Sequence, residues 1–300
     1  MDDLFQTPDS AIARHSTEMH IVPPSGKPLK FDFDGYVLNR VAHDEFLVEL
    51  AKESGAEYLV NSRVDKVEEN SVILRNGDTY TAKVIVDAGG HNGVIRRDYW
   101  TEESTKIPVK FVLMDGDFGE AVELHFGSMA PGGYAWMFPK SSGANIGLGI
   151  QRSFSKGKNL NQYTEEFVAK YDGEITFNGA GSLPMSGTIK KFVKGNYVLV
   201  GDAAGMVLPS NGAGITIAMI GGRIAGNVIA EHLKSGLPLE EYEKIWKKQM
   251  GKVMANSKRS FKIGSLLFRL PDWILNMMFN RLTKGIIWRA VTCRKMFWVV

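Results

Sequence analysis

The sequence is poor in cysteine and has no long apolar segment. The single cysteine, Cys293, excludes a disulfide framework and a cysteine-based zinc or iron–sulfur site within one chain. No apolar run reaches the ~20 residues that a membrane-spanning helix needs. The acidic start, Met1–Asp3, is not followed by the apolar segment of a secretory signal. We therefore expect an intracellular, cytoplasmic globular protein without a metal site.

The residues that are present supply a sizeable core and an uneven charge. Apolar residues make up 44% and charged residues 23% of the 300 residues, a length that suits about two domains. From Lys244 to Val300, 13 basic residues stand against one acid, so this segment carries +12 and the first 243 residues carry −9. A basic tail on an acidic body predicts an anionic partner. No recognised nucleic-acid-binding module accompanies the charge, so we do not expect nucleic acid.

Hydrophobic patterning predicts a mixture of helices and two kinds of sheet. Residues 1–35 carry little pattern apart from a turn at Pro23–Gly26. Four strands within residues 109–150 suggest an antiparallel sheet. The other elements that we predict are helices over Val41–Ser54 (with Gly55 at its C-cap), near Leu160–Tyr171 and from Gly212 to the end with a break at Pro271, and strands near Tyr58–Val60, Arg63–Val67, Val72–Leu74, Val84–Val86 and Glu174–Gly181.

The segment from Tyr197 to Ile215 carries the strongest functional signal. A continuous apolar run, Tyr197–Val200, predicts a strand buried on both faces, and Gly201 and Gly205 allow a ligand close to the backbone. Asp202 places a carboxylate at the carboxyl end of this strand, where open α/β sheets bind ligands. A helix beginning at about Gly214 offers N–H groups to negative charge, such as that on the pyrimidine edge of a reduced flavin.

Gly201–Gly205, Pro209–Ile215 and Gly221–Gly226 together resemble the second flavin motif of the p-hydroxybenzoate-hydroxylase-like FAD superfamily, and within it the geranylgeranyl reductases. The resemblance implies FAD as cofactor and saturation of the geranylgeranyl chains of archaeal ether lipids. It also implies that the side chain of Arg40 and the backbone of Val64 contact FAD. The remaining flavin-binding residues that it implies are Asp202, Gly212, Gly214 and Ile215.

A middle motif of the same superfamily resembles Asp87–Gly93. Gly89 then stands where an acid is usual and Gly93 where a serine is usual. A turn at the end of a strand explains these glycines equally well, and His91 is interpreted as a turn residue rather than a catalyst.

The Gly-x-Gly-x-x-Gly unit with which this superfamily begins is absent from the sequence. We therefore expect an α/β fold, with α+β elements, that lacks its first βαβ unit, as a truncated form or a natural remnant. The predicted parts are a partial FAD-binding domain (1–105), an antiparallel substrate domain (106–190), a returning FAD-binding strand and helix (191–235), and a basic C-terminal helical region (236–300).

The segment Pro131–Lys140 alternates aromatic with small or flexible residues. On a strand, Tyr134, Trp136 and Phe138 share one face at intervals of ~7 Å. Such a face forms either part of a core or a wall for an apolar ligand. The segment resembles the reductase family's P-x-x-Y-x-W-x-F-P motif, which implies that the three aromatics line a cavity for the isoprenoid chain beside the flavin. Tyr134 is a candidate proton donor by its position, with the flavin itself or a residue of the absent N-terminal unit as the alternatives.

The basic tail combines cations with apolar and aromatic residues in Trp273–Phe279, Ile286–Trp288 and Phe297–Val300. This pattern is typical of helices on an anionic membrane surface, although packed helices with solvated basic faces produce it too. We expect a peripheral membrane protein. The resemblance adds a lipid head-group contact from Lys258 or Arg259, and we take Arg259 as the candidate.

Two other functions are compatible with these motifs. A flavin monooxygenase or halogenase of the same superfamily would share the flavin segment. A flavin-free lipid-binding remnant would explain the missing phosphate-binding unit. The residues do not identify the electron donor.

Overall fold

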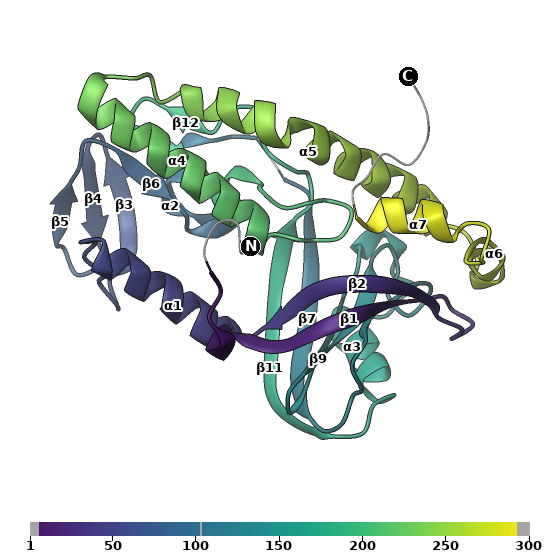
Figure 1. Cartoon of the computed structure of the whole chain (residues 1–300). Coiled ribbons are helices and arrows are strands. Elements are labelled where there is room, and N and C mark those ends of the chain that lie inside the picture. The colour runs from purple at the N-terminus through teal and green to yellow at the C-terminus, as the bar shows by residue number, and fades with distance from the viewer. Residues whose placement is uncertain (1–5, 103, 293–300) are drawn as a thin grey trace. The chain divides into compact units, whose positions relative to one another are not determined.

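A computed structural model describes residues 6–102 and 104–292, and these form two compact units. Unit 1 comprises Met1–Ala56, Ile107–Ser182 and Lys262–Val300, and unit 2 comprises Glu57–Lys106 and Leu183–Phe261. Both units mix helices with strands, as the sequence predicts (Figure 1). Among the described residues, no helix combines the length and the apolar character that crossing a bilayer requires. Met1–Asp3, Cys293 and Phe297–Val300 lie outside the described residues.

Unit 1 is built on a seven-stranded sheet in the order β11-β7-β10-β9-β8-β1-β2. β1 pairs with β8 in parallel, whereas β8–β9, β9–β10, β10–β7 and β1–β2 are antiparallel. The strands are β1 (Ile12–Val22), β2 (Leu29–Leu38), β7 (Lys106–Asp115), β8 (Val122–His125), β9 (Tyr134–Lys140), β10 (Gly143–Gly149) and β11 (Glu174–Pro184). The helices are α1 (Arg40–Glu53), α3 (Leu160–Val168), α6 (Asp272–Met278), α7 (Lys284–Val291) and the short η1 (Asp9–Ala11) and η3 (Arg152–Phe154).

The two faces of this sheet carry different cores. On one face, Ala135 and Met137 of β9 pack in a cluster that includes Tyr163 and Phe167 of α3. On the other face, Val122 and Leu124 of β8 pack with Tyr134, Trp136 and Phe138 and with Trp288 and Val291 of α7. The period-2 alternation of side chains in β8 and β9 produces this separation.

Although residues 1–35 carry little pattern in the sequence, β1 and β2 form a long hairpin there (purple in Figure 1). The predicted turn at Pro23–Gly26 joins the two strands, and the N–H of Gly26 donates to the carbonyl of Pro23 at 2.9 Å. Many outward positions of the hairpin are charged or histidine, so apolar alternation is weak in the sequence. Phe31 nevertheless stacks on Trp288 of α7, with 4.8 Å between ring centroids.

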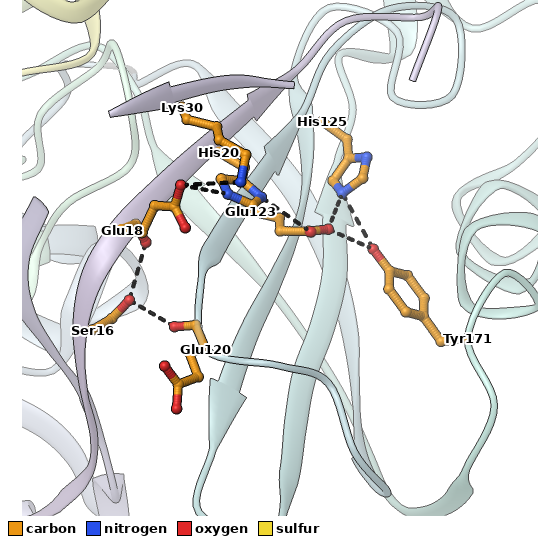
Figure 2. Close-up of polar contacts among 8 residues, drawn as sticks. All are labelled: Ser16, Glu18, His20, Lys30, Glu120, Glu123, His125 and Tyr171. Atoms are coloured by element: carbon orange, nitrogen blue, oxygen red, sulfur yellow. Dashed lines mark hydrogen bonds and ion pairs between the residues drawn. The ribbon is translucent and has the colours of Figure 1, made fainter. Parts of the chain in front are cut away.

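Several of those polar side chains form a network between β1, β8 and Tyr171, which follows the end of α3 (Figure 2). Glu123 of β8 accepts hydrogen bonds from His125 Nε2 at 2.8 Å and from the Tyr171 hydroxyl at 3.3 Å, and its other oxygen lies 3.6 Å from His20 Nδ1. His20 Nε2 lies 3.2 Å from Glu18. Since Glu123 and His125 alternate with Val122 and Leu124, the network lies on the face opposite the aromatic residues.

Unit 2 contains two three-stranded sheets and two long helices. The first sheet has the order β12-β13-β6, with β12 (Val193–Lys194), β13 (Tyr197–Leu199) and β6 (Ile85–Asp87). The second is the meander β3 (Val64–Glu68), β4 (Ser71–Leu74) and β5 (Thr79–Thr81). The helices are α2 (Val94–Tyr99), α4 (Ile215–Ser235), α5 (Glu241–Leu267, whose last turn falls in unit 1) and the short η2 (Gly90–Asn92) and η4 (Gly201–Ala204).

Within unit 2, α4 and α5 lie side by side (green in Figure 1). Gly221 of α4 makes room for Met206, because a Cβ there would lie 2.5 Å from the Met206 Sδ, and the hydroxyl of Tyr242 of α5 donates to the same sulfur at 3.5 Å. The strand predicted at Tyr58–Val60 is absent. These residues are 57%, 44% and 66% exposed in turn, so their β propensity is not used in a sheet.

The Glu123 network predicts an acid-sensitive contribution to the stability of unit 1. Burial acts to raise the pKa of Glu123, but the hydrogen bond from His125, the charges of His125 and His20, and the Tyr171 hydroxyl outweigh it and lower the pKa. An acid with a lowered folded-state pKa stabilises the fold while it is ionised, and this contribution disappears as the pH falls through that pKa. We expect Glu123→Gln to cost about 1–3 kcal/mol at pH 7.

Urea unfolding followed by tryptophan fluorescence measures this cost. The difference from the wild type should shrink as the pH falls below 4.5, the ordinary value for the group. Glu45→Gln, at an exposed position on α1, is the control and should have no effect. Equal stability of Glu123→Gln and the wild type at pH 7 would contradict the assignment.

Candidate functional site

The parallel pairing of β6 with β13 brings two loops together in unit 2. Ile85, Val86 and Asp87 pair in register with Tyr197, Val198 and Leu199, so η2 and η4 follow the two strands at the same edge. A cavity of about 320 Å³ lies there. It is lined by His91, Asn92, Arg96, Arg97, Trp100, Thr101, Glu102, Ser104, Lys106, Pro184, Ile189, Asp202, Ala203 and Gly205.

Asp202 lies in the first turn of η4, between this cavity and the start of α4. A Cβ at Gly214, the N-cap of α4, would lie 3.7 Å from Asp202 Oδ1. Burial raises the pKa of the Asp202 carboxyl, and the charge of His91 opposes this rise. The structure thus places a hydrogen-bond acceptor beside a helix N-terminus that no side chain caps.

The segment between η4 and α4 is held by its own hydrogen bonds. The carbonyl of Leu208 accepts from the N–H of Asn211 at 3.3 Å and of Gly212 at 2.8 Å, and the N–H of Ala213 donates to Asn211 Oδ1 at 3.0 Å. Gly212 adopts φ +71°, which L side chains rarely tolerate. Asp202, Gly212, Gly214 and Ile215, four of the predicted flavin-binding residues, therefore lie together around the start of α4.

Asp87 explains the two glycines of the middle motif. Its carboxylate accepts from the N–H of Gly89 at 2.8 Å and of Arg96 at 2.9 Å. A Cβ at Gly93 would overlap this carboxylate. The structure therefore favours the turn interpretation of Gly89 and Gly93, with the acid supplied from the end of β6 instead.

His91 is more than a turn residue, because it lines the cavity with Asp202. Burial lowers the pKa of His91, the charge of Lys106 lowers it further, and Asp202 opposes both. Sequence reasoning missed His91, Ser104 and Lys106 as cavity residues. The available signal for His91 was its place just after one of two apolar strands whose carboxyl ends meet if they are parallel.

The residues around this cavity fit one end of a flavin nucleotide. Asp202 provides an acceptor for hydroxyl groups, and the N-terminus of α4 favours negative charge. The buried Oγ of Ser104, which lines the cavity, has no hydrogen-bond partner among the described residues. Lys106 adds positive charge at the cavity, whereas the guanidinium of Arg97 is paired with Asp98 at 2.5 Å.

The two other predicted FAD contacts, Val64 and Arg40, each have a partner close to them in sequence. Val64 is the first residue of β3 in unit 2 and pairs with Leu74 of β4. Arg40 is the first residue of α1 in unit 1, where its guanidinium forms an ion pair with Asp44 at 3.0 Å. The roles of Arg40 and Val64 in holding FAD stay predictions.

In unit 1, β9 presents the predicted aromatic face. The ring centroids of Tyr134 and Trp136 are 6.0 Å apart and those of Trp136 and Phe138 are 6.1 Å apart. The three rings are partly buried, whereas Ala135, Met137 and Pro139 on the opposite face are buried. The prediction that the three aromatics share one face is confirmed.

Next to these aromatics, β10 has almost no side chains on the same face. Gly147 pairs with Trp136 and Gly149 with Tyr134. A Cβ at Gly147 would lie 2.6 Å from Cζ2 of Trp136, so the indole occupies the space that a side chain would fill. The indole Nε1 donates to Asn145 Oδ1 at 2.7 Å, which fixes the orientation of the ring. The result is a flat apolar surface along β9 and β10, which we call the aromatic face.

The hydroxyl of Tyr134 keeps its proton over the physiological pH range, because burial raises its pKa to about 12. The phenol is therefore a hydrogen-bond donor and a weak acid at the end of the aromatic face.

The C-terminal helices of unit 1 expose apolar side chains among cations. Trp273 is 64%, Met277 68% and Leu282 94% exposed. The acid Asp272 is engaged, since it accepts from the N–H and the hydroxyl of Ser128 at 3.0 and 2.6 Å. The exposed cations in this region are Lys262, Arg269, Arg281, Lys284 and Arg289.

The two head-group candidates on α5 differ in their surroundings. Lys258 is partly buried and its Nζ donates to the carbonyl of Thr188 at 3.4 Å. Arg259 is exposed. These surroundings favour Arg259 over Lys258 for contact with an external ligand.

Sequence comparison identifies relatives along most of the chain. The geranylgeranyl reductase catalytic domain matches residues 105–180. A digeranylgeranylglycerophospholipid reductase of Methanocella arvoryzae is 34% identical over 87% of this chain and 71% of that protein. Another, from Methanosphaera stadtmanae, is 30% identical over 95% of this chain and 79% of that protein. The aligned region thus spans about three quarters of these curated relatives.

Structure comparison agrees on the fold. A geranylgeranyl bacteriochlorophyll reductase-like protein of Thermoplasma acidophilum has a TM-score of 0.82 at 24% identity, over 98% of this chain and 79% of its own. A probable FAD-dependent monooxygenase of Pseudomonas aeruginosa has a TM-score of 0.64 at 16% identity, over 89% of this chain and 81% of its own.

The fold is therefore that of FAD-dependent oxidoreductases, and the sequence matches are to reductases in particular. With these relatives at 30% identity or more over at least 71% of their length, the chain belongs to the geranylgeranyl reductase family.

Proposed function

We propose that this chain is an FAD-dependent reductase that saturates the geranylgeranyl chains of archaeal ether lipids. The observation that carries the proposal is the aromatic face, which lies within the matched catalytic domain and joins three aromatic rings to a glycine strip. Family membership separates this function from a monooxygenase or halogenase, whose structures share the fold at 16–17% identity.

An isoprenoid chain suits the aromatic face by size and polarity. The face is flat because Gly147 and Gly149 leave no side chain beside Trp136 and Tyr134. Each CH₂ group that leaves water contributes roughly 0.8 kcal/mol, so a long prenyl chain gains much from such a surface. The indole N–H of Trp136 donates to Asn145 Oδ1, so this polar group does not need a partner from the ligand.

For the cofactor, Asp202, Gly212, Gly214 and Ile215 would hold the flavin end of FAD at the start of α4, with Val64 and Arg40 as further contacts. Bound and reduced, FAD supplies the hydride that an alkene carbon must receive. Asp202 would accept hydrogen bonds from ribityl hydroxyls, and the N–H groups at the start of α4 would favour negative charge on the pyrimidine edge.

The second alkene carbon needs a proton, and we assign Tyr134 as its donor. Its hydroxyl stays protonated because burial raises its pKa to about 12. A donor this weak has to transfer its proton late, as charge develops on carbon, and the apolar surroundings of the aromatic face exclude water from that step.

We also propose that the exposed part of the C-terminal helices rests on an anionic membrane. Trp273, Met277 and Leu282 would enter the interface while the cations of this region meet lipid phosphates. Each such cation contributes about 1 kcal/mol near an anionic surface. Arg259 is the proposed contact for the substrate's phosphate.

Mass spectrometry tests the reductase activity directly. The chain is loaded with FAD, reduced with dithionite and incubated with digeranylgeranylglyceryl phosphate. The lipid should gain 2 Da for each double bond reduced, which is the mass of the two added hydrogens. A chain that binds FAD and leaves the lipid mass unchanged would contradict the reductase function, and a chain that binds no FAD would support the lipid-binding remnant.

Two variants separate the roles on the aromatic face. Tyr134→Phe removes only the hydroxyl and should lower kcat by ~10²-fold, the contribution of a general acid, with little change in KM. Trp136→Ala removes the central ring and should mainly raise KM. An unchanged kcat in Tyr134→Phe would exclude Tyr134 as the donor.

Sedimentation with vesicles tests the membrane surface. The chain should bind vesicles that contain anionic phospholipid and bind zwitterionic vesicles much more weakly. Trp273→Ser combined with Met277→Ser should reduce binding by about tenfold, because two exposed apolar anchors are lost. Tyr80→Ser, at an exposed aromatic residue of unit 2, is the matched control and should bind normally. Equal binding to both kinds of vesicle would contradict the proposal.

A further inference from the structure

Two consecutive residues of α5 contact the segment that carries the proposed flavin site. Ser257 is fully buried at 0% exposure. Its Oγ accepts a hydrogen bond from the N–H of Ser210 at 3.0 Å and lies 3.0 Å from the Ser210 hydroxyl. Ser210 belongs to the Pro209–Gly214 segment, which we call the flavin loop. A serine inside a helix commonly bonds its own helix, whereas Ser257 bonds a different element.

Lys258 contacts the same region from the next position. Its Nζ donates to the carbonyl of Thr188 at 3.4 Å. Gly187 makes room for the side chain, because a Cβ there would overlap Cε of Lys258 and lie 3.3 Å from Cγ of Pro209. The end of the lysine side chain and the ring of Pro209, the first residue of the flavin loop, therefore both lie close to Gly187.

The segment that Lys258 contacts is itself bound to η4. The N–H of Ile189 donates to the carbonyl of Ala204 at 3.1 Å. A Cβ at Gly205 would lie 2.6 Å from the carbonyl oxygen of Gly187, so the two backbones are in direct contact. Residues 187–189, η4 and the flavin loop thus form one packed junction with α5.

Hydrogen bonds couple Ser210 to the rest of the flavin loop. The hydrogen bonds of Leu208 to Asn211, Gly212 and Ala213 tie the loop into a single turn. A displacement of Ser210 therefore shifts Gly212 and Gly214, and with them the N-terminus of α4. The partner of Lys258 is a neutral carbonyl, and among the residues that the structure describes its ammonium group forms no ion pair, so it adds positive charge beside the loop.

We propose that Ser257 and Lys258 are positioning residues for the flavin, Ser257 by fixing the flavin loop and Lys258 by adding positive charge beside it. The inference rests on the proposed function, because it assumes that FAD binds at this loop. A fixed loop presents the N–H groups of α4 in one geometry, which lowers the cost of ordering them on binding. A nearby cation favours the negatively charged reduced flavin over the oxidised form.

The test of Ser257 combines hydrogen exchange without FAD and flavin titration with it. In Ser257→Ala, amide exchange in residues 206–214 should rise about tenfold, and FAD should bind about five- to tenfold more weakly, with an altered 450 nm band. Ser235→Ala is the control, since it removes an exposed hydroxyl contact (to the carbonyl of Glu231) at the far end of α4. The control should leave all three readouts unchanged.

The test of Lys258 is the reduction potential of the bound flavin. Lys258→Met should make the potential more negative, and Lys258→Arg should retain most of the wild-type value because it keeps the charge. A purely structural role would change thermal stability in both variants without this distinction.

The outcomes separate the inference from the function on which it rests. Wild-type FAD affinity, spectrum and potential in Ser257→Ala and Lys258→Met would overturn the inference and leave the proposed function standing. Faster exchange in Ser257→Ala with unchanged flavin properties would show that Ser257 stabilises the loop without affecting the flavin, and this result would also overturn the inference. A wild-type chain that binds no FAD would overturn both proposals, whatever the exchange shows.

Discussion

The parallel pairing of β6 with β13 is the constraint on which the candidate flavin site depends. Because the two strands run in the same direction, the residues that follow them meet at one edge, and His91 and Asp202 line one cavity. The carboxylate of Asp87, the last residue of β6, accepts hydrogen bonds from backbone N–H groups on either side of His91. Asp202, just after β13, is left facing the cavity and the start of α4. Two acids at the ends of neighbouring strands thus have different tasks.

The two faces of the seven-stranded sheet of unit 1 carry different kinds of side chain. Alternation in β8 and β9 places the aromatic face on one side and the Glu123 network on the other. The network joins the β1–β2 hairpin to β8, and the same hairpin contributes Phe31 to the aromatic side through its stacking on Trp288. Charged groups that stabilise the sheet are therefore kept away from the surface proposed to hold hydrocarbon, where an unpaired charge would be costly.

The sequence predicts the elements with strong apolar patterns well. β13, the four strands β7 to β10, α1 with Gly55 beyond its end, and the shared face of Tyr134, Trp136 and Phe138 all follow from period and turn chemistry. The hairpin β1–β2 escapes prediction because residues such as Glu18, His20 and Lys30 satisfy one another across strands and hide the alternation. The prediction of a strand at Tyr58–Val60 is wrong because these residues, although they have high β propensity, are exposed and pair with no other described strand.

Only part of the candidate site can be predicted from the sequence. Asp202 and the flavin loop stand out because glycines and an acid follow a buried strand within a few residues. His91 and Ser257 do not stand out in the sequence, because their roles depend on residues more than 40 positions away. Ser257, for example, contacts Ser210. Asp87 shows the same limit: the glycines at 89 and 93 look like departures from a motif until the carboxylate that fills their space is located.

The central claim is that Asp202 at the end of β13 holds a flavin, and a titration of FAD by fluorescence quenching tests it most directly. Asp202→Asn removes the carboxylate charge with little change in size, whereas Asp78→Asn makes the same change in an exposed turn of unit 2. The account predicts that Asp202→Asn binds FAD at least about tenfold more weakly than the wild type, the effect of losing about 1.4 kcal/mol, while Asp78→Asn binds normally. Equal affinity of the wild type and Asp202→Asn would contradict it.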